Sequence, residues 1–311
     1  MKQTPLRLAT FLALGTAMFS GVNTFIGKIG VTAIKDPLIF TTLKNLVVGV
    51  LLIGLWFAWR RWREIKTLSA RQWTKLALIG VIGGAIPFAL FFTGLSQTSA
   101  INGALIHKTL FVWVLLLAIP ILKERLSGGQ WLGIIMVAAA NLFVGGFTGF
   151  KYNTGELLIL VATILWAVEN VIAKIVLKNI SSLTVAAVRM IGGSALLAAF
   201  ILIRGGAGAV FSLSGVQWSW TLLSGLLLGG YVLTWYAALK RAPATYVAVL
   251  LVPATLVTNI LSAIFVTHAL TTVQLINGAL LVAGVMMLIL FPTRVAKNIS
   301  TAPVTELTAD H

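Results

Sequence analysis

Apolar stretches of about 20 residues follow one another along almost the whole chain, and this is the length that a helix needs to cross a bilayer. Of the 311 residues, 59% are hydrophobic and only 10% are charged. Soluble domains carry roughly 25% charged residues. We therefore expect an all-α integral membrane protein without a separate soluble domain.

Ten membrane-spanning helices are predicted, five in each half of the chain. They cover residues 8–28, 38–59, 74–94, 99–122, 130–147, 155–177, 183–203, 219–239, 244–267 and 273–291. The first helix follows Lys2 and Arg7 and therefore has features of a signal peptide. A matching segment in mid-chain, which cannot be a signal, favours a retained membrane helix.

The loops between the predicted helices differ sharply in charge. With the N-terminus inside, fifteen lysine and arginine residues fall on the inner side and four on the outer side, namely Lys28, Lys35, Lys151 and Arg204. Cytoplasmic loops are the positively charged ones. We therefore expect a multi-pass protein of the cytoplasmic (inner) membrane with both termini cytoplasmic and a polar tail at 293–311. The net charge of +16 follows this pattern, so we expect contact with the lipid bilayer and no nucleic-acid partner.

The two halves of the chain repeat each other. A shift of 144 residues aligns Leu95 with Leu239, Ala100 with Ala244 and Gln130 with Gln274. A shift of 146 places GVNTFIGKIG (21–30) beside AVENVIAKIV (167–176). Each half has an odd number of helices, so the second half enters the membrane upside down. We expect two inverted repeats, 1–148 and 149–292, which is an architecture of alternating-access transport.

The ends of the fourth and ninth predicted helices read LKERLSGGQWLG (122–133) and THALTTVQLING (267–278). Together with the two five-helix halves, these segments resemble the drug/metabolite transporter superfamily in its EamA-like branch. The resemblance covers about residues 8–291. It implies a substrate held between the halves by helices one to four and six to nine, with helices five and ten peripheral.

Three positions bear on how far this resemblance extends. The family typically carries a proline in the middle of helices four and nine. Pro253 fits this pattern, whereas Thr109 stands at the aligned place in helix four. His268 stands where the second half would have a glutamate. The expected fold is unaffected, but the substrate of any one member does not transfer.

Polar residues form a stripe on the first and the sixth helix. Under the 146-residue shift, Asn23 pairs with Glu169 and Ser20 pairs with Trp166. Ser20 and Asn23 lie on one face of the first helix, and Trp166 and Glu169 lie on one face of the sixth. The two stripes predict a shared cavity. The alternative is that small and amide residues only hold helices together.

Four charged residues lie inside predicted spans: Lys44, Lys108, Glu169 and Arg189. A charge at mid-bilayer costs at least about 2.5 kcal/mol unless it meets a partner, water or a ligand. Lys44 and Arg189 occupy corresponding places in the repeats, and snorkelling is their alternative role. For Glu169 the alternative is a salt bridge, first of all with Lys108. The surplus of cations favours an anionic substrate, and a zwitterion fits with its amine at Glu169 and its carboxylate at Lys108.

Further candidates flank these charges. His107 lies about 100° around the helix from Lys108, so the two are not expected to share one tight face; it is a proton-exchange site or an interhelical packing residue.

Aromatic residues recur in helices three and eight: Phe88, Phe91, Phe92, Tyr231, Trp235 and Tyr236. Trp235 is our candidate for a substrate wall, with helix packing as the alternative. Pro87 and Pro253 fall near mid-span and are candidate hinges. Three glycine pairs, Gly83-Gly84, Gly192-Gly193 and Gly229-Gly230, favour close helix approach.

The function expected from these features is secondary transport of a small anionic or zwitterionic metabolite, such as an amino acid or organic acid, in the direction of export. Protons are a candidate coupling ion through Glu169. Efflux of lipophilic cations is the alternative. An intramembrane enzyme is a remote one, because the chain has no HExxH, GxSxG, paired aspartates or cysteine. No cofactor or metal is expected, and a homodimer is one oligomeric state considered.

Overall fold

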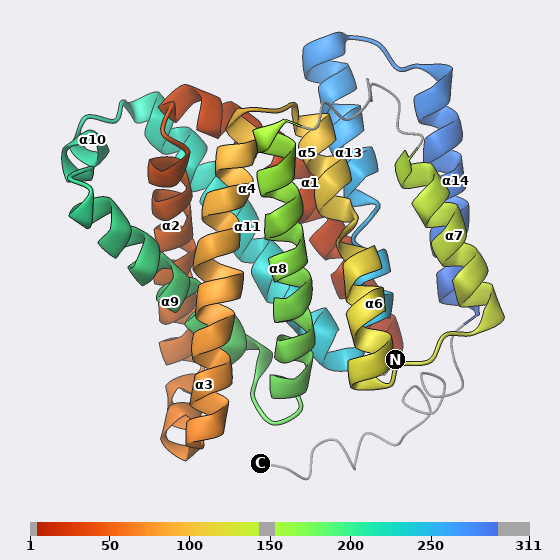
Figure 1. Ribbon diagram of the computed structural model, residues 1–311, viewed down its shortest axis with the longest axis horizontal. Coiled ribbons are helices and arrows are strands. Elements are labelled where there is room, and N and C mark those ends of the chain that lie inside the picture. The colour runs from red at the N-terminus through yellow and green to blue at the C-terminus, as the bar shows by residue number, and fades with distance from the viewer. Residues whose placement is uncertain (1–4, 143–152, 292–311) are drawn as a thin grey trace.

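The computed structural model describes residues 5–142 and 153–291, which form helices joined by short turns (Figure 1). The elements of the first half are α1 (Pro5–Ile34), α2 (Pro37–Ala58), η1 (Arg61–Thr67), α3 (Ala70–Ile79), η2 (Gly80–Ala85), α4 (Ile86–Ser96), α5 (Ala100–Lys108), α6 (Leu110–Leu122) and α7 (Gly128–Leu142). Those of the second half are α8 (Thr154–Val176), α9 (Ser182–Ile203), α10 (Ala207–Phe211), α11 (Gly215–Arg241), α12 (Ala244–Val249), α13 (Ala254–Ser262), η3 (Ala263–Thr267) and α14 (Thr272–Leu290). The all-α membrane fold is confirmed.

Nine segments of the described chain are long and apolar enough to span a bilayer. Three of them consist of more than one helical element, namely α3–η2–α4, α5–α6 and α12–α13–η3. The tenth predicted span corresponds to α7, a shorter apolar helix, and residues 143–147 of that prediction lie outside the described residues. Five spans in each half place the halves in opposite orientations.

Some boundaries differ from the predicted ones. Helix α1 continues to Ile34, six residues past the predicted end, so Lys28, which was counted with the outer segment, lies well inside the helix. The short helices η1 and α10 were read as loops, because charged or glycine-rich stretches of five to seven residues carry no hydropathy signal. Three predicted features, Lys2, Lys151 and the tail at 293–311, lie outside the described residues.

Matching caps begin four of the helices. The hydroxyl oxygens of Ser69 and Ser214 accept from the backbone N–H groups of Gln72 and Gln217, three residues later. Each glutamine side chain in turn accepts from the backbone N–H of its serine. Ser127 and Thr271 make the same arrangement with Gln130 and Gln274. Such capping boxes satisfy two of the free N–H groups at a helix start. Each pair lies at corresponding points of the two halves, so the repeat extends to the helix ends.

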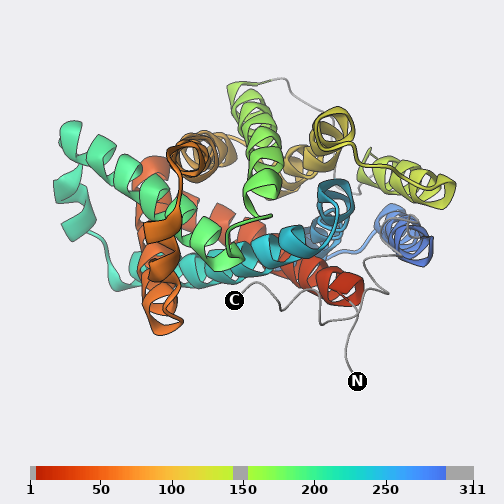
Figure 2. The same ribbon diagram turned by 90° about the horizontal axis from the view of Figure 1, so that it is seen from below.

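The α7 and α14 helices lie next to each other on one side of the bundle, while the short α10 lies on the opposite side (Figures 1 and 2). A Cβ added at Gly133 of α7 would lie 2.6 Å from the Gly284 oxygen of α14, so the two backbones touch. The interior of the bundle is formed by the other helices, among which α1 packs along α11. The peripheral position of helices five and ten therefore agrees with the family resemblance.

The third span contains a π-helical turn, η2, directly before Pro87. Proline has no N–H, so the carbonyl of Gly83, four residues earlier, loses its helical partner. The indole N–H of Trp166 donates to this oxygen at 2.9 Å. Pro87 thereby fixes a side chain of the second half against a helix of the first.

The fourth and ninth spans break at the same place. Helix α5 ends at Lys108 and α6 begins at Leu110, while α12 ends at Val249 and α13 begins at Ala254 after Pro253. The 144-residue shift superposes Thr109 on Pro253. Thr109 breaks its helix without a proline, because its hydroxyl donates to the Ile106 oxygen at 2.7 Å. The hinge role of Pro87 and Pro253 stays a prediction.

Candidate functional site

A small cavity of about 40 Å³ lies between the two halves. This volume holds a few water molecules. Residues from seven helices line it: Ser20, Asn23 and Thr24 of α1, Lys44 of α2, Phe88, Phe91 and Phe92 of α4, His107 of α5, Trp166 of α8, Arg189 of α9, and Leu228 and Tyr231 of α11. Both repeats contribute, as expected for a site at a repeat interface.

Two cations in this lining have unused hydrogen-bond donors. Lys44 is 0% exposed and Arg189 is 3% exposed, so neither snorkels. Within the described residues, Lys44 Nζ and the Nε and Nη1 atoms of Arg189 have no hydrogen-bond partner. Lys44 Nζ lies 3.4 Å from the ring centroid of Phe92 and 5.2 Å from that of Phe88, and Arg189 Cζ lies 5.5 Å from the latter. Lys44 and Arg189 therefore border the same aromatic ring.

Lys108 does not line the cavity but contacts Ser20, which does. Its ammonium donates to Ser20 Oγ at 2.6 Å and lies 3.2 Å from His107 Nδ1. The expectation that His107 and Lys108 do not share one tight face is wrong, because their side-chain nitrogen atoms are in contact. The imidazole of His107 packs between Phe91 and Trp166, at 5.2 and 5.0 Å between ring centroids.

Glu169 also lies behind the cavity, held by an aromatic residue. The Tyr236 hydroxyl donates to Glu169 Oε1. The expected Lys108–Glu169 ion pair is absent: in the described part of the chain the ion pairs are Arg61–Glu64 and Arg204–Asp36.

Arg189 is the cation beside Glu169. A Cβ added at Gly83 would lie 2.5 Å from Glu169 Cγ and 3.0 Å from Arg189 Nε, so both side chains pack against this glycine. The guanidinium of Arg189 also lies 5.6 Å from the Tyr236 ring centroid. Tyr236 thus joins the acid to the cation from the side away from the cavity.

The remaining predicted residues divide between lining and support. Asn23 lines the cavity and accepts from Ser224 Oγ at 2.7 Å. Trp235 points elsewhere: its indole donates to Asn170 at 2.7 Å, and its ring stacks on Tyr231 at 5.9 Å. Five of the eight predicted binding residues line the cavity: Asn23, Lys44, His107, Trp166 and Arg189. Lys108, Glu169 and Trp235 lie behind it.

Several lining residues were not selected as binding residues from the sequence. Phe88, Phe92 and Tyr231 belong to the aromatic sets of helices three and eight, and the spacing of Phe88 and Phe92 by four residues after Pro87 was a usable signal. Thr24 and Leu228 carry no signal, since a threonine or leucine in a membrane helix is ordinary.

The two ends of the bundle are closed by lysines at repeat-related positions. Lys28 Nζ donates to the carbonyl of Leu95 at 2.9 Å, and Lys174 Nζ donates to that of Leu239 at 2.7 Å. The 146-residue shift superposes Lys28 on Lys174, and the 144-residue shift superposes Leu95 on Leu239. A lysine that meets the free carbonyls at a helix end is favourable. We name the end with Lys174 the basic end, because Lys123, Arg125, Lys178, Lys240 and Arg241 lie there.

A carboxylate joins the two halves at the basic end. Glu124 accepts from the backbone N–H groups of Ala244 at 2.6 Å and Thr245 at 3.0 Å, and from the Thr245 hydroxyl at 2.7 Å. These are the first residues of α12, whose N–H groups have no helical partner. At the opposite end, the repeat-related residue is His268, which is exposed and has φ +51°. The carboxylates that join the halves at that opposite end are instead Glu156, which accepts from the Asn102 amide at 2.9 Å, and Asp36, which pairs with Arg204.

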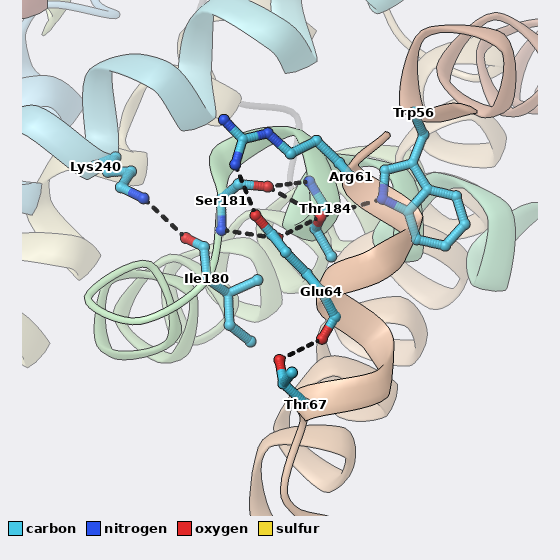
Figure 3. Close-up of polar contacts among 8 residues, drawn as sticks. All are labelled: Trp56, Arg61, Glu64, Thr67, Ile180, Ser181, Thr184 and Lys240. Atoms are coloured by element: carbon cyan, nitrogen blue, oxygen red, sulfur yellow. Dashed lines mark hydrogen bonds and ion pairs between the residues drawn. The ribbon is translucent and has the colours of Figure 1, made fainter. Parts of the chain in front are cut away.

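A second carboxylate ties η1 to the start of α9 outside the membrane-spanning segments (Figure 3). Glu64 accepts from the Thr184 hydroxyl at 2.7 Å, from the Ser181 N–H at 3.3 Å and from Arg61 at 3.0 Å. Burial raises the pKa of Glu64, but these hydrogen bonds outweigh it and hold that pKa below its ordinary value. The Trp56 indole donates to the same Thr184 hydroxyl at 3.1 Å.

Comparison with known proteins identifies a family. The model of the EamA-like transporter family matches residues 7–146 and again residues 153–290. An uncharacterized transporter of Synechocystis sp. is 25% identical over 93% of this chain and 88% of its own length. An uncharacterized transporter of Archaeoglobus fulgidus is 28% identical over 89% of this chain and 95% of its own length. A solved crystal structure superposes with a TM-score of 0.71 at 18% identity, covering 94% of this chain and 99% of that one.

Proposed function

The chain belongs to the EamA-like transporter family, and from this premise we propose that it is a secondary transporter of a small anionic or zwitterionic metabolite. The chain is a multi-pass membrane protein. We place it in the cytoplasmic membrane with both termini and the basic end facing the cytoplasm, because that end carries most of the lysine and arginine. Export is the direction that we propose.

One observation carries the choice of substrate. Lys44 and Arg189 present unused donors to a cavity between the repeats. A charge held at this depth costs about 2.5–3.5 kcal/mol on insertion scales unless something offsets it. A carboxylate or phosphate group of a substrate is such a partner.

The size of the cavity supports alternating access, which is the mechanism that we propose. About 40 Å³ does not hold a metabolite, so the two halves must separate before a substrate can enter. The helix breaks at Thr109 and Pro253 and the π-helical turn before Pro87 are the candidate places for this movement. Opening at one end and closing at the other is the motion that inverted repeats support.

Protons are the coupling ion in this proposal, with Glu169 as the carrier. The Tyr236 hydroxyl donates to Glu169, and Arg189 lies beside it, so a change in the charge of Glu169 alters the surroundings of a cavity cation. Glu169→Gln should remove the stimulation of transport by a proton gradient. Full proton-dependent transport by this variant would exclude the role of Glu169.

Efflux of lipophilic cations is less well supported. It would use the aromatic lining and Glu169, but this carboxylate does not line the cavity, whereas two cations do. An enzyme would need a nucleophile beside a base in the cavity, and His107 packs instead between two aromatic rings.

The test is a thermal-shift screen of the purified protein followed by flux measurements in proteoliposomes. Carboxylates, amino acids and lipophilic cations are screened with the unaltered protein, Lys44→Gln, Lys108→Gln and the control Lys66→Gln, whose lysine is exposed. A ligand of the folded state raises the melting temperature. We expect stabilisation by anions or amino acids that Lys44→Gln loses and the control keeps. Absence of saturable flux for the whole panel would refute transport, and stabilisation by lipophilic cations alone, unchanged in Lys44→Gln, would support the alternative.

A further inference from the structure

The charges around the cavity do not balance. Three cations, Lys44, Lys108 and Arg189, are buried there, and Glu169 is the carboxylate that lies beside them. With these groups ionised, the unliganded site carries a surplus of two positive charges. We propose, resting on the transport function above, that the substrate is a small dianion, either a dicarboxylate or a phosphate monoester, and that Lys44 and Arg189 are its two anchors.

The hydrogen bonds separate these two cations from the other charged groups. Lys108 is held by the Ser20 hydroxyl at 2.6 Å, and Glu169 is held by Tyr236. Lys44 Nζ and two nitrogen atoms of Arg189 are the donors left without a partner among the described residues. A buried donor that makes no hydrogen bond is costly, and a charged one more so. The groups that a substrate must satisfy are therefore Lys44 and Arg189.

Their placement favours a ligand with two negative charges. Lys44 belongs to α2 and Arg189 to α9, which are corresponding helices of the two halves and pack against each other. Both cations lie within 5.5 Å of the Phe88 ring centroid and line the same cavity, so a ligand in that cavity would lie between residues of both halves. A ligand with a single negative charge would leave part of the positive surplus without a partner.

A zwitterion fits this arrangement poorly. Its ammonium group would enter a cavity lined by two cations, while Glu169, the acid that could receive it, does not line the cavity. The lining offers instead further donors to anionic oxygens, from the Ser20 hydroxyl and the amide of Asn23. The site is thus built for negative charge along its length.

Binding measurements with simple probes test this inference. The purified protein is titrated with succinate, glycerol 3-phosphate, butyrate and alanine, and the melting temperature is followed. We expect succinate or glycerol 3-phosphate to bind at least tenfold more tightly than butyrate or alanine. Tighter binding of succinate identifies dicarboxylates, and tighter binding of glycerol 3-phosphate identifies phosphate monoesters.

Two variants distinguish anchoring from a structural role. Lys44→Gln and Arg189→Gln should each weaken dianion binding at least tenfold and should bring butyrate and the dianion to similar affinities, because one charge of the ligand loses its partner. The melting temperature of each unliganded variant should be unchanged or higher, since an unpaired buried charge has been removed. Lys66→Gln should keep the selectivity of the unaltered protein.

Other outcomes would overturn the inference. If alanine binds as tightly as the dianions, or if Lys44→Gln keeps the preference for dianions, the two cations are not anchors. Saturable flux of alanine in proteoliposomes under the same conditions would leave the transport function standing and remove the dianion. Absence of flux for every probe would remove both.

Discussion

Glu124 gives the most direct test of how the two halves close. Its carboxylate extends from the end of α6 in the first half and accepts three hydrogen bonds from Ala244 and Thr245, at the start of α12 in the second half. In a conformer open at the basic end these contacts are broken. Glu124→Ala should therefore destabilise the closed conformer without removing any group from the cavity.

The size of the effect follows from these contacts. A hydrogen bond to a charged group contributes about 1.5–3 kcal/mol when it is buried. Glu124 is partly exposed and water replaces part of each bond on opening, so we take about 3 kcal/mol for the three bonds together. This corresponds to a roughly 100-fold shift of the ratio between the closed and open conformers.

The assay uses the absence of cysteine from the chain. Leu228→Cys places one thiol in the cavity lining, and an impermeant maleimide is applied from the side of the basic end in oriented membranes. Glu124→Ala should increase the labelling rate of this thiol toward the 100-fold limit, and the control Lys123→Gln, which changes an exposed neighbouring charge, should not. Equal labelling rates in the two folded variants would refute the reasoning that Glu124 holds this end closed.

Three further predictions concern packing and stability. Gly193→Ala should lower the free energy of unfolding by about 1–3 kcal/mol, because its Cβ would meet the backbone of Gly84. Gly192→Ala should not, because the nearest atom to its Cβ would lie 3.9 Å away. Denaturant unfolding in detergent compares the two variants. Lys174→Met should cost about 1–3 kcal/mol and more than Lys28→Met, since Lys174 makes two hydrogen bonds of 2.7 Å and Lys28 one of 2.9 Å and one of 3.4 Å; equal losses would contradict the geometry. The pKa of Glu64 is lower in the folded protein, so its carboxylate stabilises the fold above the ordinary pKa and this contribution is lost as the pH falls through the lowered value; melting temperatures against pH should show this loss, and Glu64→Gln should abolish it.

Hydropathy predicted the spans well because the bilayer imposes both a length and a composition on every membrane helix. It predicted ends less well, since a helix continues past the bilayer wherever its caps allow. Lys28 illustrates the consequence. Its charge reads as a loop signal in the sequence, yet it lies in α1, because its ammonium meets the carbonyls at the end of α4.

The sequence predicted those site residues whose position follows from the cost of burying a charge. It did not predict contacts that depend on how a helix is rotated about its axis. An ionisable residue inside a span must face a cavity or a partner, and Lys44 and Arg189 do face the cavity. The partner of Glu169 could not be read in this way, because Tyr236 lies on a different helix whose angle about its axis is set by packing. The same limit placed Trp235 in the predicted site, whereas its indole donates to Asn170 behind the lining.

The repeat relation itself separates what is symmetric in this protein from what is not. The capping boxes, the lysines at the helix ends and the breaks in the fourth and ninth spans occur in both halves, so each half carries the elements of a helix bundle that closes at one end. Glu124 and His268 occupy corresponding positions, but only Glu124 contacts the start of a helix in the other half. At the opposite end the halves are joined by different carboxylates, Glu156 on Asn102 and Asp36 on Arg204. Because the contacts at the two ends are not equivalent, we expect unequal free energies for closing them, set at positions remote from the cavity residues that select the substrate.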